Sequence, residues 1–227
     1  MISQNMARII AKISGDGNLS GKQIMYFNTC LILIDEFKKD IKKEFGKANL
    51  SEGTMSNGTP YVAVYGKKIA QSLTSFIPSY NSCDIFIPKE ITKSNKKIIK
   101  EYVRSFYDDE GCASLRLNRK TEEWKRNITL SSNSNKILGQ VKRILENLGI
   151  RTNKIIMNYK LSNYDKSFVL SITGKDNFIK FKEKIGFKHP RKIKMLGLII
   201  KSYKATSKHQ KRFLKLKEKI NELVVPK

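Results

Sequence analysis

The chain has 227 residues, and 45 lysines and arginines against 20 acidic residues give it a formal net charge of +25. Apolar residues make up 40% of the sequence, which is enough for a packed core and excludes general disorder. A charge surplus this large repels itself in a compact fold. We therefore expect a polyanionic partner, and nucleic acid before an anionic membrane surface.

Residue counts and short stretches of sequence exclude several other classes of protein. The longest apolar run, 30–34, is far shorter than the roughly 20 residues that cross a bilayer. Three widely spaced cysteines and two histidines make neither a disulfide framework nor a zinc finger. The first residues lack the charged and apolar regions of a secretory signal, so we expect the protein to stay in the cytoplasm, or in the organellar matrix if it is organelle-encoded.

Apolar periodicity in the first part of the chain predicts helices alternating with strands. The expected elements are a helix over 7–16, two strands up to Thr29, a helix through Phe45, a turn-rich stretch over 51–60, a strand over 61–65 and a helix over 67–76. Gly46 follows the second helix where a left-handed cap residue is expected, and Pro78 closes the third.

The second part of the chain repeats this order, which indicates an internal duplication. The expected elements are a helix from Asn95 to Gly111, strands over 113–119 and 127–132, a helix over 136–148, strands over 154–161 and 167–173, a helix from Gly174 to Gly186 and a last amphipathic helix from Lys211. The periodicity predicts a first repeat over 1–80, a linker over 81–94, a second repeat over 95–203 and a basic C-terminal helix within 204–227.

Two of the predicted helices end in an acid followed by a glycine, at Asp16-Gly17 and at Glu110-Gly111. A carboxylate at a helix C-terminus is normally unfavourable, because the helix dipole and the unpaired carbonyl groups are negative there. A divalent cation reverses this, since Mg²⁺ takes oxygen ligands and can bind a carboxylate and a carbonyl together. The two acids therefore indicate a metal site.

A small residue lies one helical turn before each acidic end, Ala11 in the first helix and Ser105 in the second. Small residues allow two helices to approach closely. If these helices pack together, Asp16 and Glu110 lie side by side. Paired carboxylates that hold metal ions suit phosphoryl transfer, in which cations polarise the phosphate and activate water.

These two segments, 9–17 and 103–111, resemble the nine-residue motif of the LAGLIDADG homing endonucleases, in the single-chain form with two pseudo-symmetric halves. The first copy departs from the family pattern at Lys12, a usually apolar position, and at Ser14, where the first aspartate is common. The resemblance implies an α+β fold of two αββαββα repeats, each with a four-stranded antiparallel sheet, packed through the two motif helices.

The resemblance further implies a monomeric, site-specific double-strand DNA endonuclease that is encoded in an intron or intein. Its Mg²⁺ ions, for which Ca²⁺ is a non-catalytic substitute, would be held by the carboxylates of Asp16 and Glu110 and by the carbonyl groups of Gly15 and Asp109. Each sheet would lie in the major groove of a long DNA target site.

Basic and amide side chains on the predicted strands support this mode of binding. The candidate groove-contacting residues are Lys22, Tyr26, Arg116, Asn118, Arg119 and Lys120. The family also implies a basic or amide residue beside each metal site. By position the candidates are Asn28 or Thr29, Ser132 or Asn133, and Lys67, Lys175, Lys188 or Arg191.

Two alternatives remain open at this point. An intron maturase that binds structured RNA, or a catalytically weakened nucleic-acid-binding protein, would use the same fold. A general architectural nucleic-acid binder would explain the charge but not two acids at matched helix ends.

Overall fold

The computed structural model describes residues 2–118, 120–121, 123–159, 166–204 and 210–222. The first repeat consists of α1 (Gln4–Ser14), β1 (Gly17–Ser20), β2 (Gln23–Phe27), α2 (Leu31–Phe45), β3 (Asn49–Thr54), β4 (Pro60–Tyr65) and α3 (Lys67–Phe76). A short helix, α4 (Lys89–Thr92), follows. The second repeat consists of α5 (Lys96–Glu110), β5 (Gly111–Leu117), β6 (Trp124–Ser132), α6 (Asn135–Asn147), β7 (Ile156–Tyr159), β8 (Lys166–Ile172) and α7 (Lys175–Lys184). The helices α8 (Pro190–Ser202) and α9 (Gln210–Asn221) end the described chain.

The two repeats have the same sheet topology, which confirms the predicted fold class. The strand orders are β1-β2-β4-β3 and β5-β6-β8-β7, and all neighbouring strands are antiparallel. The motif glycines occupy equivalent places, because Gly17 lies opposite Tyr26 and Gly111 lies opposite Leu130 in the strand register. This register defines which residues of the two halves correspond.

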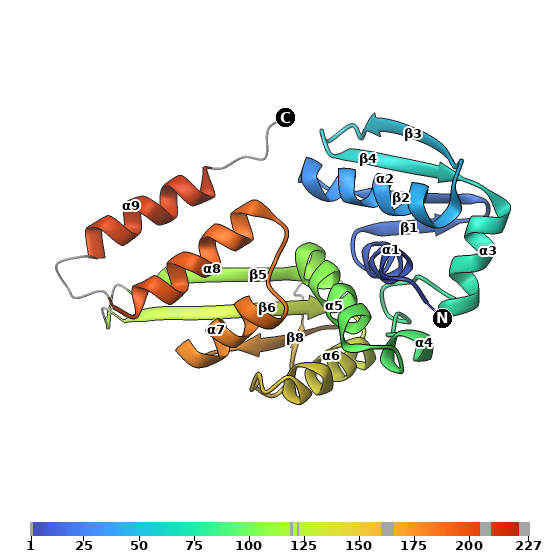
Figure 1. Ribbon diagram of the computed structural model, residues 1–227. Coiled ribbons are helices and arrows are strands. Elements are labelled where there is room, and N and C mark those ends of the chain that lie inside the picture. The colour runs from blue at the N-terminus through green and yellow to red at the C-terminus, as the bar shows by residue number, and fades with distance from the viewer. Residues whose placement is uncertain (1, 119, 122, 160–165, 205–209, 223–227) are drawn as a thin grey trace.

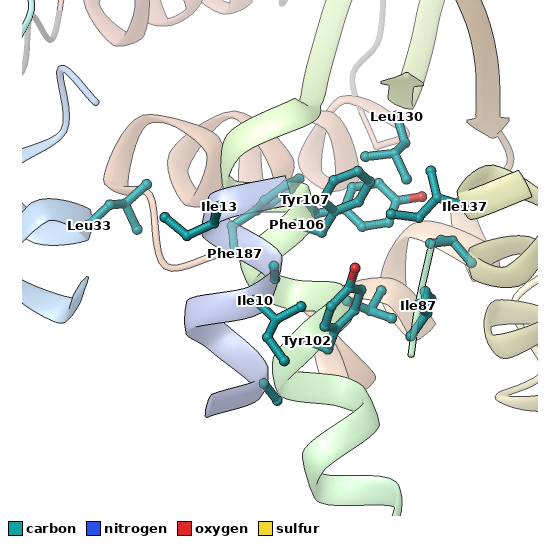
Figure 2. Packing of buried hydrophobic residues seen from close by; sticks show 14 of the residues in the cluster. Ile10, Ile13, Leu33, Ile87, Tyr102, Phe106, Tyr107, Leu130, Ile137 and Phe187 are labelled. Carbon is teal, nitrogen blue, oxygen red and sulfur yellow. The ribbon is translucent and has the colours of Figure 1, made fainter. Parts of the chain in front are cut away.

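The motif helices α1 and α5 lie side by side at the centre, with one sheet on either side of the pair (Figure 1). Their contact is apolar and continuous with the core of both repeats. Figure 2 shows Ile10 and Ile13 of α1 near Tyr102 and Phe106 of α5, and these four residues are at most 1% exposed. The central pair is therefore enclosed on both sides by its own repeats.

Side-chain caps fix where the motif helices begin. The Ser3 hydroxyl accepts a hydrogen bond from the Met6 amide at 2.9 Å, and the Asn95 side chain accepts from the amides of Lys97 and Ile98 at 3.0 and 3.1 Å. Both residues are of the type that satisfies the first free amides of a helix. Because each helix starts at a fixed residue, its acidic end falls at a fixed place too.

Three elements differ from the sequence prediction. The turn-rich stretch contains the edge strand β3, in which only Leu50 packs against the core, so no apolar alternation marks it. The predicted linker contains α4, which buries Ile91. The helix α8 was not predicted, although Pro190 occupies its first turn and Leu196 and Ile199 lie on its buried face. Among the described helices, none is long and apolar enough to cross a membrane.

Candidate active site

The ends of α1 and α5 are in direct contact at Gly15 and Asp109. A Cβ atom added to Gly15 would lie 2.9 Å from the Cβ of Asp109, which is closer than real Cβ atoms approach. One helical turn before Gly15 and Asp109, Ala11 and Ser105 are fully buried, as their spacing from the acidic ends predicts. The next residue after each contact residue is an acid, so the helix pair brings Asp16 and Glu110 to the same edge of the molecule.

A third carboxylate, Asp109, lies beneath these two, and we call Asp16, Asp109 and Glu110 the acid cluster. The Tyr26 hydroxyl donates to Asp109 Oδ1 at 2.7 Å. The Asn28 amide lies 3.0 Å from Asp16 Oδ2 and 3.2 Å from Asp109 Oδ1. Asn28 itself is held from α2, because its Oδ1 accepts from the Cys30 amide at 2.9 Å. A strand-end amide thus connects the acids of both repeats.

A lysine from α8 occupies the end of α5. The Lys192 ammonium donates to the backbone carbonyl groups of Tyr107 and Asp109, at 3.2 Å each, and to that of Asp108. These carbonyl groups belong to the last turn of the helix, where the carbonyl groups begin to lack partners within the helix, although that of Tyr107 still accepts from the backbone amide of Gly111. A cation is favoured at that position. Lys192 therefore stabilises the helix end that carries Asp109 and Glu110.

Burial and mutual repulsion make the acid cluster hold protons more tightly than free carboxyl groups do. Burial raises the pKa of Asp16, against the lowering effects of Lys192, Lys12 and Asn28. Burial and the charge of Asp16 raise the pKa of Glu110 to about 7. Burial also raises the pKa of Asp109, and the charge of Asp16 adds to it. Ionisation of all three carboxyl groups is therefore unfavourable unless a further positive charge lies beside them.

Behind the acid cluster, Glu36 of α2 anchors a buried network of ion pairs. Its carboxylate lies 3.2 Å from Lys12 Nζ, 2.8 Å from the Arg104 guanidinium and 2.9 Å from Lys188 Nζ. Burial opposes ionisation of Glu36, but these three cations outweigh it and hold its pKa at about 2. Lys12, which departs from the motif pattern, is therefore one member of a network that connects α1, α2, α5 and the segment before α8.

The other half of this network centres on Arg8. Its guanidinium lies 2.6 Å from Asp40 of α2 and 2.9 Å from Glu101 of α5. In the second motif, Asp108 accepts from the amides of Lys188 and His189 at 2.8 and 2.9 Å, and so fixes the start of α8. Replacing one partner of such a buried pair leaves a charge without compensation.

The two halves of the site are not equivalent in chemistry. Positions that match by register carry Tyr26 and Leu130, and the strand ends carry Asn28 and Ser132. Ser132 accepts from the Ser134 amide at 3.1 Å, just as Asn28 accepts from the amide of Cys30. Only the first repeat therefore supplies an amide to the acids from its strand end.

Several predicted contact residues lie where a duplex could reach them. Lys22, Arg116 and Lys120 are exposed on the sheets or their hairpins. Asn118 lies at the β5–β6 turn, where its side chain accepts from the Lys120 amide at 3.1 Å. Arg119 lies outside the described residues. Arg191 is exposed in the first turn of α8.

Other predicted contacts were wrong. Tyr26 is 0% exposed, because it shares the core face of β2 with Ile24, so it cannot contact a duplex. Asn28 lies beside Asp16, as its strand-end position predicts, but it is buried and cannot also contact a groove. Lys188 binds Glu36 on the helical side of the sheets. Asn133 donates to Ser82 at 3.1 Å and not to an acid.

The lysines that follow the fourth strands also lie away from the acids. β4 begins beside Asn28, because the backbone amide of Asn28 donates to the Pro60 carbonyl at 3.2 Å. It ends near Lys22, because the backbone amide of Gly66 donates to the Lys22 carbonyl. At 3.3 Å per residue, Lys67 is about 20 Å from the acid end of the sheet. Lys175 follows the end of β8 that is distant from the acids. Phe168, near the start of β8, pairs with Ser132, and Ile172, at its end, pairs with Ile128. Neither lysine supports the acid cluster.

Comparison with known proteins identifies a matching family model and solved structures of similar fold. Residues 97–186 match the family model described as a LAGLIDADG-like domain. An I-DmoI variant in complex with its target DNA and manganese aligns with a TM-score of 0.58 at 18% identity, over 81% of this chain and 93% of that one. The homing endonuclease I-WcaI bound to its DNA recognition sequence aligns with a TM-score of 0.56 at 13% identity, over 85% of this chain and 87% of that one.

Two further relatives extend the comparison. The N-terminal LAGLIDADG domain of DUF199/WhiA aligns with a TM-score of 0.53 at 13% identity, over 81% of this chain and 82% of that one. The uncharacterized protein MJ0314 of Methanocaldococcus jannaschii is 24% identical over 153 residues, 65% of this chain, and the match spans only 56% of that relative.

The second repeat is therefore a LAGLIDADG-like domain, and the chain has the fold of the two-repeat LAGLIDADG homing endonucleases.

Proposed function

We propose that the chain is a site-specific DNA endonuclease that cleaves both strands of a duplex at the acid cluster. The observation that carries the proposal is the contact of Gly15 with Asp109, which places Asp16 and Glu110 together at the ends of two packed helices. Each acid also directly precedes the first strand of its own sheet, so the cluster adjoins both sheets. Structures of I-DmoI with DNA and manganese, and with DNA and calcium, support the proposal by analogy.

The residues at the site fit a divalent cation, and we propose Mg²⁺. The donors are all oxygen atoms, the type that Mg²⁺ prefers. Asp109 Oδ2 is buried without a hydrogen-bond partner among the described residues, so this oxygen atom is free to bind a cation. Asp16 and Glu110 would hold the ions. Within the described ranges, no group of three His, Cys, Asp or Glu side chains is arranged to hold a metal ion by itself. Backbone carbonyl groups, water and DNA phosphates would supply the other oxygen ligands.

The chain's own residues prepare the site for hydrolysis. When bound, a divalent cation polarises the phosphate, lowers the pKa of a water molecule and stabilises the leaving oxygen. Asn28 orients the Asp16 carboxylate, and Tyr26 orients Asp109. Lys192 compensates the carbonyl groups at the end of α5. We further propose that the enzyme acts as a monomer, because one chain supplies both acids, and that it is encoded within an intron or intein.

A second candidate is a nucleic-acid-binding protein of the same fold that does not cleave, and an intron maturase that binds RNA belongs to this class. The Asp109 carbonyl, one of the predicted metal ligands, already accepts a hydrogen bond from Lys192 at 3.2 Å. A protein that no longer needed a cation at that helix end could retain a lysine there.

One experiment separates the two candidates. The protein is incubated with a library of randomised duplexes in Ca²⁺, bound duplexes are sequenced, and the enriched duplex is then exposed to Mg²⁺ or Mn²⁺. The endonuclease gives one discrete double-strand break only after the exchange, and Asp16→Asn and Glu110→Gln controls bind without cleaving. Sequence-specific binding with no cleavage in either metal contradicts the endonuclease and selects the second candidate.

A further inference from the structure

The outward faces of the two sheets differ in charge. In the first sheet, Gln23 lies opposite Tyr65 and Tyr65 lies opposite Asn49, and Phe27 pairs with Tyr61. Their sequence neighbours, such as Ile24 and Val64, are 0% exposed on the other face. Every outward position of β1 to β4, all within the described part of the chain, is uncharged. In a chain with a net charge of +25, a whole sheet face without a lysine or arginine requires a reason.

The corresponding face of the second sheet is basic at its outer end. Arg116 pairs with Lys125, and both are exposed. Closer to the acid cluster, the outward residues of β5 and β6 are small and polar, such as Ser114 opposite Asn127 and Cys112 opposite Thr129, while β7 exposes Ile156 opposite Val169 of β8. The two halves of the proposed DNA surface therefore offer a duplex different chemical groups.

On the first face, apolar rings lie nearest the acids. The ring of Tyr61 lies across the edge strand, because a Cβ at Gly53 would be 2.5 Å from the Tyr61 hydroxyl. The ring centres of Phe27 and Tyr61 are 6.1 Å apart. Met25 is the next outward residue along β2, towards the hairpin. This end of the face therefore combines apolar contact area with the amide of Asn18, which is exposed opposite Met25.

At the outer end of the first face, amide side chains lie beside the ring of Tyr65. The Gln23 amide donates to the Tyr65 hydroxyl at 3.1 Å, which fixes the direction of the side chain. Asn49 lies in the same row on the edge strand. A glutamine or asparagine amide can pair with the N6 and N7 edge of adenine, apolar groups contact the thymine methyl, and arginine pairs with guanine O6 and N7.

Resting on the proposed function, we infer that the two half-sites of the DNA target differ in base composition. The half-site under the first sheet is rich in A·T pairs, which Met25 and Phe27 recognise through thymine methyl groups near the centre and Gln23 through adenine further out. The half-site under the second sheet carries a guanine that Arg116 binds, towards its outer end. The first face alone contributes little counterion release, so affinity for its half depends on sequence more than on salt.

An uncharged, aromatic four-stranded face could instead stack the unpaired bases of single-stranded RNA. The structure favours the duplex, because Tyr61 lies along the sheet at Gly53 and the face is continuous with Asp16 through β1. The RNA remains an outcome of the test.

The test is selection from a randomised duplex library in Ca²⁺ with the wild-type chain and three variants. Gln23→Arg should change one preferred A·T pair to G·C in the A·T-rich half, by about tenfold or more in relative affinity. Arg116→Gln should remove a guanine preference in the other half. Gln71→Arg adds the same charge on exposed α3, away from the face, and should change affinity for all duplexes alike.

Three results would overturn the inference. The two half-sites could have equal base composition, Gln23→Arg and Arg116→Gln could change base preference in the same half-site, or the chain could bind single-stranded RNA more tightly than duplex DNA. Enrichment of no duplex at all would overturn the proposed function as well. An asymmetric site that Mg²⁺ does not cause to be cleaved would support the inference while contradicting the endonuclease, so the two failures are distinguishable.

Discussion

Lys192 of α8 donates a hydrogen bond to the Asp109 carbonyl at 3.2 Å, at the helix end where the family resemblance places a metal ligand. In the proposed site, this side-chain ammonium would compete with a divalent cation for the same oxygen atom. No equivalent contact is found at Gly15 among the described residues, so the two acid ends differ in how they are compensated.

Replacing Lys192 by methionine should expose this competition. Lys192→Met keeps an unbranched side chain and removes the charged donor from three carbonyl groups, which should cost about 1–3 kcal/mol of unfolding free energy in EDTA. The stabilisation gained on adding Ca²⁺ should increase, because the Asp109 carbonyl becomes available to the cation. Thermal unfolding with and without Ca²⁺ measures both effects.

Lys194→Met is the matched control, because Lys194 is exposed on the same helix. It should leave unfolding and the Ca²⁺ response unchanged. A Lys192→Met protein that behaves like this control would show that the lysine neither stabilises α5 nor competes with a cation.

The two acids should be unequal in their effect on cleavage. Asp16→Asn and Glu110→Gln each remove a metal-binding charge and should lower double-strand cleavage by orders of magnitude, with DNA binding within about tenfold of wild type. Because Asn28 supports Asp16 and only Ser132 occupies the matching place in the second repeat, nicking should persist more in Glu110→Gln. Gel analysis of supercoiled plasmid carrying the selected site separates nicked from linear product. Full double-strand cleavage by either variant is incompatible with the assignment.

The close packing of the motif helices should not tolerate a large side chain. Ala11→Leu inserts three heavy atoms into a contact where Ala11 is 0% exposed, and overpacking of this kind costs about 1–3 kcal/mol. The separated helices should also lose cleavage activity, since Asp16 moves away from Glu110. Urea denaturation compared with Gln71→Leu, an exposed helix position on α3, isolates the packing effect. An unfolding midpoint equal to that of the control would argue against a tight contact.

The sequence was sufficient to predict the duplication, the motif helices and the two acids, because each depends on local spacing. It could not show that Tyr26 faces the core. That depends on the register of β2 against β4, and a one-residue change of register reverses the faces of a strand. Lys192 was missed for a related reason. It reaches α5 across 83 to 85 positions of sequence, a distance over which no motif spacing connects the two segments.

The last prediction concerns pH. Burial and the charge of Asp16 raise the pKa of Glu110 from 4.5 to about 7 in the folded chain, so the folded state binds a proton more tightly than the unfolded state. This contribution to stability is fully present below pH 4.5 and is lost as the pH rises through 7. In EDTA, the unfolding free energy of wild type should therefore fall from pH 5 to pH 8, and Glu110→Gln should remove up to about 3 kcal/mol of that fall.

Glu183→Gln, which changes an exposed carboxylate on α7, should follow the wild-type profile. Ca²⁺ should reverse the trend, because only the ionised carboxylate binds the cation. A Glu110→Gln profile parallel to wild type in EDTA would mean that Glu110 is ionised without cost, and the acid cluster would then not need a cation to compensate it.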